Sequence, residues 1–199
     1  MLLDLTATVK MKVVTSVYRR LICFSRSLAV LPAISFSLPV TFSRLTRDDM
    51  AALRKFRSDK IVPIAENRWA RGDSCFALLH QEQIISLGWV ATKRTAIDYF
   101  NCEVEILAKA VCVYDHYTLP NYQQYGLNYG RVISTLQYYK NLGFERSIGF
   151  VAWENKVGIR ASEKNGYQAI GCYHYWRWRI KSRYKTAQWG EEALPRLII

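Results

Sequence analysis

A strand, a loop and a helix follow one another without a spacer between residues 109 and 142. Residues 109–118, KAVCVYDHYT, form an apolar run rich in β-branched and aromatic side chains, which predicts a strand. Residues 127–142 repeat apolar side chains at helical spacing, and residues 146–153, RSIGFVAW, predict a second strand. Such a unit closes as a right-handed parallel crossover, so the fold needs a sheet with at least one parallel pair.

The sequence on either side of this unit alternates between strand and helix patterns. Strands are expected at 39–46, 74–81, 83–94 and 167–180, and helices at 47–57, 64–72 and 154–166. Residues 95–107 fit a strand or a loop over a cleft. This order predicts an α/β chain with a mixed sheet.

The N-terminal residues predict a basic amphipathic helix. Over residues 10–30, Val13, Val17, Leu21 and Phe24 share one helical face, and most of the basic side chains lie elsewhere. Such a helix could lie on an anionic membrane or dock on the body of the protein. We therefore divide the chain into an extension with a linker at 1–38, a main domain at 39–182 and a tail at 183–199.

The net charge of +12 is concentrated at the two ends of the chain. Basic ends suit a membrane surface, a nucleic acid or a phosphorylated ligand, and a plain solubility bias explains them equally well. The apolar segment at 21–40 is interrupted by Arg26, Pro32 and Pro39 and does not predict a membrane span. A peripheral membrane contact through residues 10–30 is the expectation, and a nucleic acid partner is not.

Cysteine and histidine usage indicates neither a metal site nor a disulfide framework. The five cysteines have no knuckle or redox-pair spacing, and the three histidines are scattered. Buried free thiols in a reducing, cytoplasmic setting are the simplest interpretation.

Residues 173–180, YHYWRWRI, place aromatic and basic side chains in alternation. Alternation places His174, Trp176 and Trp178 on one face, and on the other Tyr173, Tyr175, Arg177 and Arg179. These residues could stack nucleic acid bases or line an acceptor cleft. The favoured interpretation is an edge strand whose tryptophans pack on a helix while its arginines face water.

The loop at 119–126 has the features of an anion site at a helix start. Pro120 ends the strand, Gly126 leaves room for a ligand, Gly130 lies in the first turn and Arg131 adds positive charge. Unpaired N–H groups at a helix N-terminus can hold a diphosphate. The loop lacks the Gly-Lys-Ser/Thr of a Walker loop and does not match GxGxxG.

Residues 109–171 resemble the acetyl-CoA-binding half of the GCN5-related N-acetyltransferase superfamily. Gln123, Gly126 and Asn128 match that family's Gln/Arg-x-x-Gly-x-Gly/Ala loop, and Glu154-Asn155 with Gly166-Tyr167 matches its downstream block. The resemblance implies an α+β fold with a mostly antiparallel sheet of about 6–7 strands and about 4 helices. The N-terminal helix would be an addition to that fold.

The resemblance also implies an activity, a donor and a binding site. The chain would transfer an acetyl group from acetyl-CoA to a primary amine of an unidentified acceptor. The alternative is a weakly active or inactive binding module that acts at a membrane surface or on nucleic acid through its basic ends. The implied acetyl-CoA contacts are Tyr117, Thr118, Gln123, Gln124, Tyr125, Gly126, Leu127, Asn128, Tyr129, Gly130, Arg131 and Asn155. Ser162 stands where many members place a tyrosine that protonates the departing thiolate.

A base must take a proton from the attacking amine, and His116 and Asp115 are the candidates. Strand alternation points them to opposite sides of the sheet, so only one can face a given cleft. A packing histidine and a structural ion pair are the respective alternatives, and Glu103 with Glu105 could serve as base through water.

Overall fold

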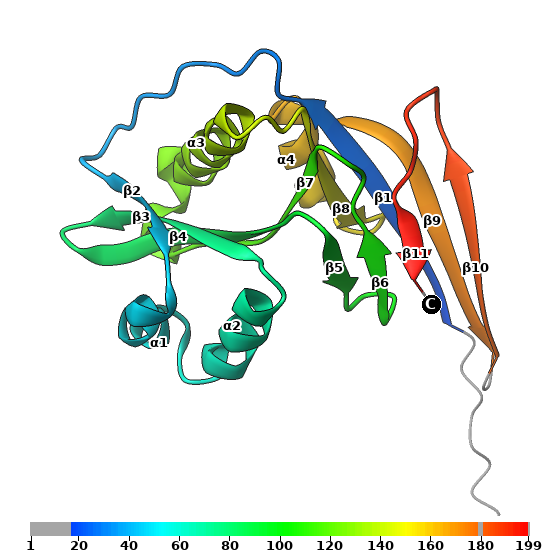
Figure 1. Ribbon diagram of the computed structural model, residues 1–199, viewed down its shortest axis with the longest axis horizontal. Coiled ribbons are helices and arrows are strands. Elements are labelled where there is room, and N and C mark those ends of the chain that lie inside the picture. Colours follow the sequence, from blue (N-terminus) through cyan, green and yellow to red (C-terminus); the bar gives the residue numbers. More distant parts are fainter. Residues whose placement is uncertain (1–16, 179–180, 199) are drawn as a thin grey trace, which may run out of the picture.

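The computed structural model describes residues 17–178 and 181–198, which form two sheets and four α-helices (Figure 1). The main sheet has the strand order β10-β9-β1-β8-β7-β4-β3-β2, and the small sheet has the order β11-β6-β5. The main sheet comprises β1 Val17–Ser27, β2 Thr41–Leu45, β3 Ser74–His80, β4 Gln83–Ala91, β7 Ala110–Thr118, β8 Arg146–Ala152, β9 Gln168–Trp178 and β10 Lys181–Gln188. The small sheet comprises β5 Arg94–Ile97, β6 Cys102–Glu105 and β11 Arg196–Ile198. The helices are α1 Met50–Arg57, α2 Ile61–Ala70, α3 Leu127–Asn141 and α4 Lys156–Lys164.

β7 and β8 pair in parallel, and every other described neighbour pair is antiparallel. The predicted α+β fold with a mixed, mostly antiparallel sheet is therefore confirmed, as is the crossover through α3. The main sheet has more strands than expected, because both ends of the chain contribute strands to it.

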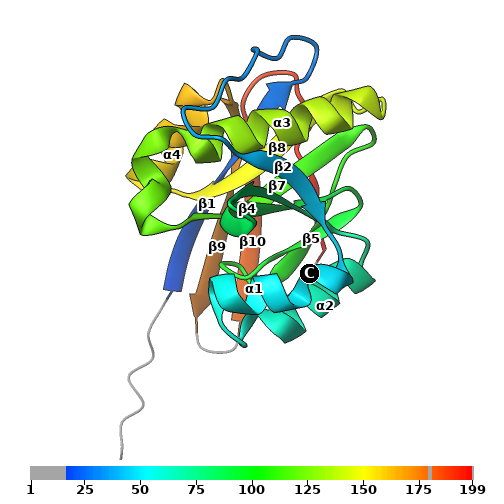
Figure 2. The same ribbon diagram turned by 90° about the vertical axis from the view of Figure 1, so that its left-hand side faces the viewer.

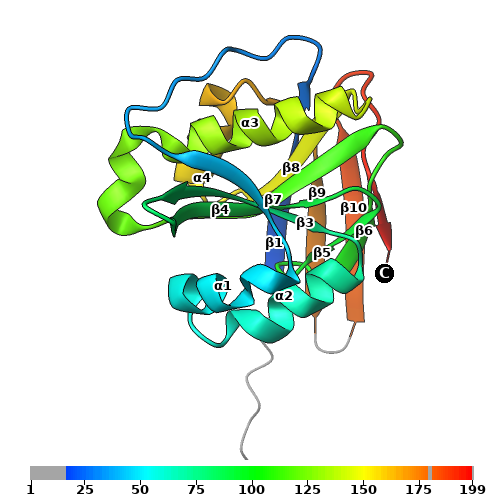
Figure 3. The ribbon, with the colours of Figure 1, turned by 60° about the vertical axis from the view of Figure 1, so that its left-hand side comes forward.

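The four described helices divide between the two faces of the main sheet. α3 and α4 lie on one face, and α1 and α2 lie on the other, below β2, β3 and β4 (Figures 2 and 3). α3 buries Val132, Ile133 and Leu136 against apolar residues of β1, β3, β4 and β7. α1 and α2 form a second cluster around Trp89 on the opposite face. The small sheet covers β1 and β9 on that same opposite face.

The predicted N-terminal helix is wrong over residues 17–27, which form β1 in the middle of the sheet. β1 pairs with β8 on one side and with β9 on the other. Leu21, Ile22, Cys23 and Phe24 are all buried, so both faces of the strand are covered. A short apolar run of this kind fits a strand or a helix by pattern, and burial on both sides decides for the strand. Residues 10–16 lie outside the described residues, so the amphipathic helix no longer supports a membrane contact.

The division into extension, domain and tail is also corrected. β10 continues the main sheet beyond residue 182, and β11 closes the small sheet against β6. The expected linker packs on the body of the protein. The ring of Phe36 lies against Gly130 of α3, so close that a Cβ on Gly130 would come within 2.3 Å of the ring. No helix in the described part of the chain is long and apolar enough to cross a membrane.

β9 is not the edge strand that the sequence suggested, because β10 lies outside it. Tyr173 and Tyr175 are buried under the small sheet. The favoured interpretation of residues 173–180 expected the tryptophan face to be buried, and this is wrong. The tyrosine face is the buried one, and Trp176 on the other face is 40% exposed.

Candidate active site

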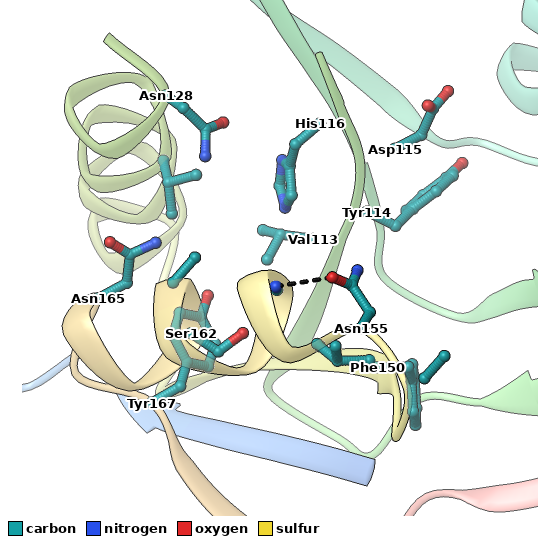
Figure 4. Close-up of a pocket in the computed structure, with 16 residues that line it drawn as sticks. Val113, Tyr114, Asp115, His116, Asn128, Phe150, Asn155, Ser162, Asn165 and Tyr167 are labelled. Carbon is teal, nitrogen blue, oxygen red and sulfur yellow. Dashed lines mark hydrogen bonds between the residues drawn. The ribbon is translucent and has the colours of Figure 1, made fainter. Parts of the chain in front are cut away.

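The two parallel strands separate soon after they begin. Their register runs from Ala110–Arg146 to Cys112–Ile148, three pairs in all. Beyond this point a cavity of about 370 Å³ opens between β7 and β8, with α3 and α4 as its further walls (Figure 4). Diverging strands leave backbone N–H and C=O groups that an extended ligand can use, as in peptide recognition by strand addition.

A β-bulge in β7 lies at the mouth of this cavity. Leu87 pairs with Tyr117 and Trp89 pairs with Tyr114, so Gly88 alone faces both Asp115 and His116. Asp115 adopts a left-handed backbone with φ of 46°. Bulges of this kind bend a strand and re-aim its side chains. His116 points into the cavity and Asp115 points to the opposite side, as the sequence predicted (Figure 4).

Arg131 of α3 holds the bulge from inside the protein. Its side chain is 1% exposed; Nε donates to Ser86 Oγ at 3.1 Å and an Nη donates to Asn128 Oδ1 at 2.8 Å. The guanidinium lies so close to β4 that a Cβ on Gly88 would come within 2.3 Å of it. The structure therefore puts this charge between α3 and β4, and the expectation that Arg131 holds a diphosphate at the loop is corrected.

The same guanidinium fixes the protonation of His116. It donates to His116 Nδ1 at 2.9 Å, and because arginine has no acceptor, Nδ1 must carry the lone pair. The side chain is exposed to the cavity, but the protein groups packed around the ring and the charge of Arg131 lower the pKa of His116 to about 3, against a smaller opposing effect of Asp115. His116 is thus neutral near pH 7 with its proton on Nε2, which makes it a hydrogen-bond donor and a poor base.

Asp115 is engaged by two arginines of the helices below the sheet. Arg57 and Arg68 donate to its two carboxylate oxygens at 3.0 and 2.5 Å. Burial opposes ionisation of the carboxyl, but these arginines, chiefly Arg68, outweigh it and hold the pKa of Asp115 below its ordinary value. Asp115 therefore ties α1 and α2 to the bulge, which is the structural alternative named for it, and it is a weak proton acceptor.

The loop before α3 is more ordered than a turn. Residues Pro120–Tyr125 form a 3-10 helix, and Gln123 Nε2 donates to the Thr118 carbonyl oxygen at 3.2 Å. Gly126 then adopts φ of 68°, and a Cβ there would meet nothing within 4 Å. The chain enters α3 at an open surface, where the first N–H groups of the helix have no carbonyl one turn earlier in α3.

Two further loop residues act differently from the sequence expectation. Gly130 donates its N–H to the Gly126 carbonyl at 3.1 Å, so this N–H is used inside the helix. Asn128 lines the cavity and turns its side chain toward Arg131, from which its Oδ1 accepts a hydrogen bond. Leu127 is buried, Tyr129 packs on the core, and Gln124 and Tyr125 are exposed.

The expected contacts at the end of β7 divide between backbone and side chain. Tyr117 packs its ring against Phe56 and Arg57 on the far face of the sheet. Thr118 is buried and shares a hydrogen bond of 2.9 Å with Ser86. Neither side chain lies in the cavity wall, so any contact with a ligand in the split would come from their backbone groups.

The α4 wall of the cavity contains the residues of the downstream block. Asn155 caps α4 by accepting from the Gly158 N–H at 2.8 Å. Ser162 lines the cavity, as does Tyr167, whose hydroxyl shares a hydrogen bond of 2.7 Å with Ser147. Burial raises the pKa of Tyr167, so this phenol is a poor acid.

Sequence reasoning missed the residues that assemble the bulge, namely Arg57, Arg68, Ser86 and Gly88. A glycine inside a strand pattern signals a bulge or a close backbone approach, so Gly88 carried a readable signal. The two helical arginines carried none, because their partner is far away in sequence.

Other reactive groups are remote from the cavity wall or suppressed. Glu103 lies on β6 beside a separate pocket. The cysteines of the described residues are free thiols, and burial raises the pKa of Cys75 to about 12 and of Cys102 to about 11. No cluster of three potential metal ligands occurs within residues 17–178 and 181–198.

Comparison with solved structures identifies the fold. The aminoglycoside N-acetyltransferase AAC(6')-Iy in complex with CoA matches with a TM-score of 0.54 and 11% identity, over 68% of this chain and 92% of that one. A GNAT-family putative acetyltransferase from Novosphingobium aromaticivorans matches with a TM-score of 0.55 and 14% identity, over 79% of this chain and 62% of that one. The chain therefore has the fold of the GCN5-related N-acetyltransferases. No protein-family model matches the sequence, and no curated protein does either.

Proposed function

We propose that the protein is a CoA-dependent N-acyltransferase that moves an acetyl group from acetyl-CoA to a primary amine. The observation that carries this proposal is the separation of β7 and β8 after three pairs, beside a bulge and a helix N-terminus. This arrangement offers a narrow, half-apolar split for an extended thioester arm and an anion site at its end. The structural similarity to an acetyltransferase in complex with CoA supports the same donor.

The donor would lie along the split with its diphosphate at the start of α3. The pantetheine amides would pair with backbone groups of β7 beyond Cys112, in the manner of an added strand. The diphosphate would meet the N–H groups of Leu127, Asn128 and Tyr129, where the helix carries partial positive charge. Gly126 supports this placement. A side chain at this position would project into the open space through which the diphosphate reaches the helix, and glycine leaves that space free.

His116 would act as a hydrogen-bond donor to the thioester oxygen. Its Nε2–H is directed at the cavity by the bulge, and its tautomer is fixed by Arg131. A donor preorganised toward the oxygen that gains charge lowers the barrier when the amine attacks the carbonyl carbon. The C–S bond then breaks and CoA leaves as thiolate.

Proton removal would fall to water rather than to His116 or Asp115. The pKa of His116 is about 3 and that of Asp115 is lowered, so neither binds the amine proton well near pH 7. The acceptor would therefore react as the neutral amine. The rate should rise with pH until the acceptor's own pKa, with no plateau set by the enzyme near pH 6.5.

The first test measures donor binding by thermal shift with CoA and acetyl-CoA. Binding at a hundredfold excess over Kd should stabilise the fold by about 2.7 kcal/mol. Gly126→Asp should abolish the shift by placing a carboxylate against the diphosphate. Gly126→Asn is the matched control, since it has the same shape, tolerates the left-handed backbone and adds no charge. The proposal fails if neither ligand shifts the wild-type protein at millimolar concentration.

The second test separates a donor from a base at His116. Release of CoA thiol would be followed with a panel of amines, including amino sugars, aminoacyl compounds and peptides. His116→Phe removes the Nε2–H and should lower kcat about 100-fold, whereas His116→Gln keeps an N–H donor and should lose less. A rate profile that titrates near pH 6.5 in the wild type and is lost in His116→Gln would instead show a base.

A further inference from the structure

A second functional surface lies on β1, β9 and β10, away from the cavity. Directly paired residues share a face of a sheet, and the register pairs Tyr18 with Trp176 and Arg20 with His174. On the other side of β9, Arg183 pairs with Trp176 and Lys185 with His174. These six residues form one continuous surface, the aromatic face. Figure 1 shows that this end of the three strands projects beyond the helices.

The rings of the aromatic face are stacked and open to solvent. The ring centroid of Trp176 lies 5.3 Å from that of Tyr18 and 5.5 Å from that of His174, and the planes of the His174 and Trp176 rings are inclined by 10°. The Tyr18 hydroxyl is 2.7 Å from His174 Nδ1, which fixes the two rings together. Even so, Tyr18 is 53% exposed and Trp176 is 40% exposed. A contiguous exposed aromatic surface of this kind marks an interaction site.

Positive charge follows the aromatic rings along the neighbouring strand. Arg183 and Lys185 are exposed on β10, and the ion pairs found among the described residues involve neither of them. Arg20 extends the charge toward α4, where it lies 4.0 Å from the ring of Trp153. Tyr18 of β1 and the rings of β9 thus lie side by side, and cations run along β10, about 5 Å from β9 across the sheet.

We propose that the aromatic face binds single-stranded nucleic acid. Exposed rings on adjacent strands stack bases, and a parallel row of cations neutralises phosphates. A duplex hides its base faces and would use only the cations. A lipid surface would use the same charges, and vesicle binding is therefore one outcome of the test. This inference is independent of acyl transfer.

The test measures fluorescence anisotropy of labelled single-stranded oligonucleotides, a 12-nucleotide oligo-dT and its ribonucleotide equivalent, with the full-length protein. We expect binding that weakens with salt, with a slope of log K against log salt of about −2 for three phosphate contacts. Trp176→Ala should weaken binding about tenfold. Arg183→Glu should weaken binding and make the salt slope shallower by at least about 0.7. Because these side chains are exposed, thermal unfolding should confirm that each variant remains folded.

Arg177→Glu is the matched control, since Arg177 is exposed on β9 next to Trp176 but on the opposite face of the sheet from Trp176 and Arg183. It should keep most of the binding. Equal loss with Arg177→Glu and Arg183→Glu would overturn the assignment to this face. Equal affinity for a duplex, or no effect of Trp176→Ala, would overturn base stacking. Absence of binding at about 100 µM protein in low salt overturns the proposal, and so does binding to phosphatidylserine vesicles without binding to either oligonucleotide.

Discussion

Replacing Gly88 by alanine tests how Arg131 builds the bulge. The new Cβ would lie 2.3 Å from Arg131 Nη1 and 2.8 Å from both Cζ and Nη2. Comfortable contacts are about 3.5–4.0 Å, so the guanidinium must retreat by about 1 Å. Its hydrogen bonds to Ser86, His116 and Asn128 span 2.8–3.1 Å and would pass beyond useful range.

The cost follows from those hydrogen bonds. Each bond to a charged donor contributes about 1.5–3 kcal/mol, and alanine regains about 0.5–1 kcal/mol over glycine in a strand. If relaxation of the guanidinium restores one of the three bonds and two are lost, Gly88→Ala should lower the free energy of unfolding by roughly 2–5 kcal/mol. In an Arg131→Met background the guanidinium is gone, and the same change should cost less than about 1 kcal/mol.

Urea unfolding of the four proteins in this cycle measures the coupling. We expect a coupling energy of at least about 1.5 kcal/mol between positions 88 and 131. Gly149→Ala is the matched control in β8, because its Cβ would meet its nearest neighbour, the Val113 carbonyl oxygen, at 3.9 Å. The reasoning is refuted if Gly88→Ala costs the same in both backgrounds, or no more than Gly149→Ala.

Three further predictions follow from other contacts. Asp115→Asn should destabilise the protein by about 1–3 kcal/mol at pH 7. Because the folded pKa of Asp115 is lowered, its contribution is present above the unfolded value of 3.8 and is lost as pH falls through the folded pKa, which urea unfolding against pH would show. His116 binds a proton below about 6.5 when unfolded but only near pH 3 when folded, so it makes stability fall as pH drops through this window, and His116→Gln should flatten that part of the profile. Gly130→Ala should clash with Phe36 and cost about 1–3 kcal/mol, a loss that Phe36→Ala should largely remove when the two are combined in thermal unfolding.

Local pattern predicted the central unit of the fold well. The strands at 110–118 and 146–152, the helix at 127–141 and their parallel crossover depend on periodicity and on turn residues that lie close together in sequence. Gly126 was identified for the same reason. A backbone turn into the left-handed region just before a helix favours glycine, and the sequence has a glycine at that position. The opposite directions of Asp115 and His116 also followed from strand alternation.

The chemistry of those two side chains did not follow from the sequence. In the sequence, His116 has no charged partner that a local pattern would indicate. In the structure, Arg131, one turn into α3, donates to its Nδ1. Asp115 is one acid in a strand until α1 and α2 bring two arginines to it. Protonation depends on desolvation and on neighbouring charge, and both are set by elements that are distant along the chain.

By itself, the sequence determined which segments could be strands and helices and where the chain must turn, and it predicted an anion site at the start of α3. Tertiary structure alone decided that residues 17–27 are a central strand, because only partners on both sides bury Leu21 and Ile22 together. It also decided which face of β9 meets water, since the small sheet covers Tyr173 and leaves Trp176 open. Periodicity fixes that two faces exist, and the choice between them depends on what packs against each.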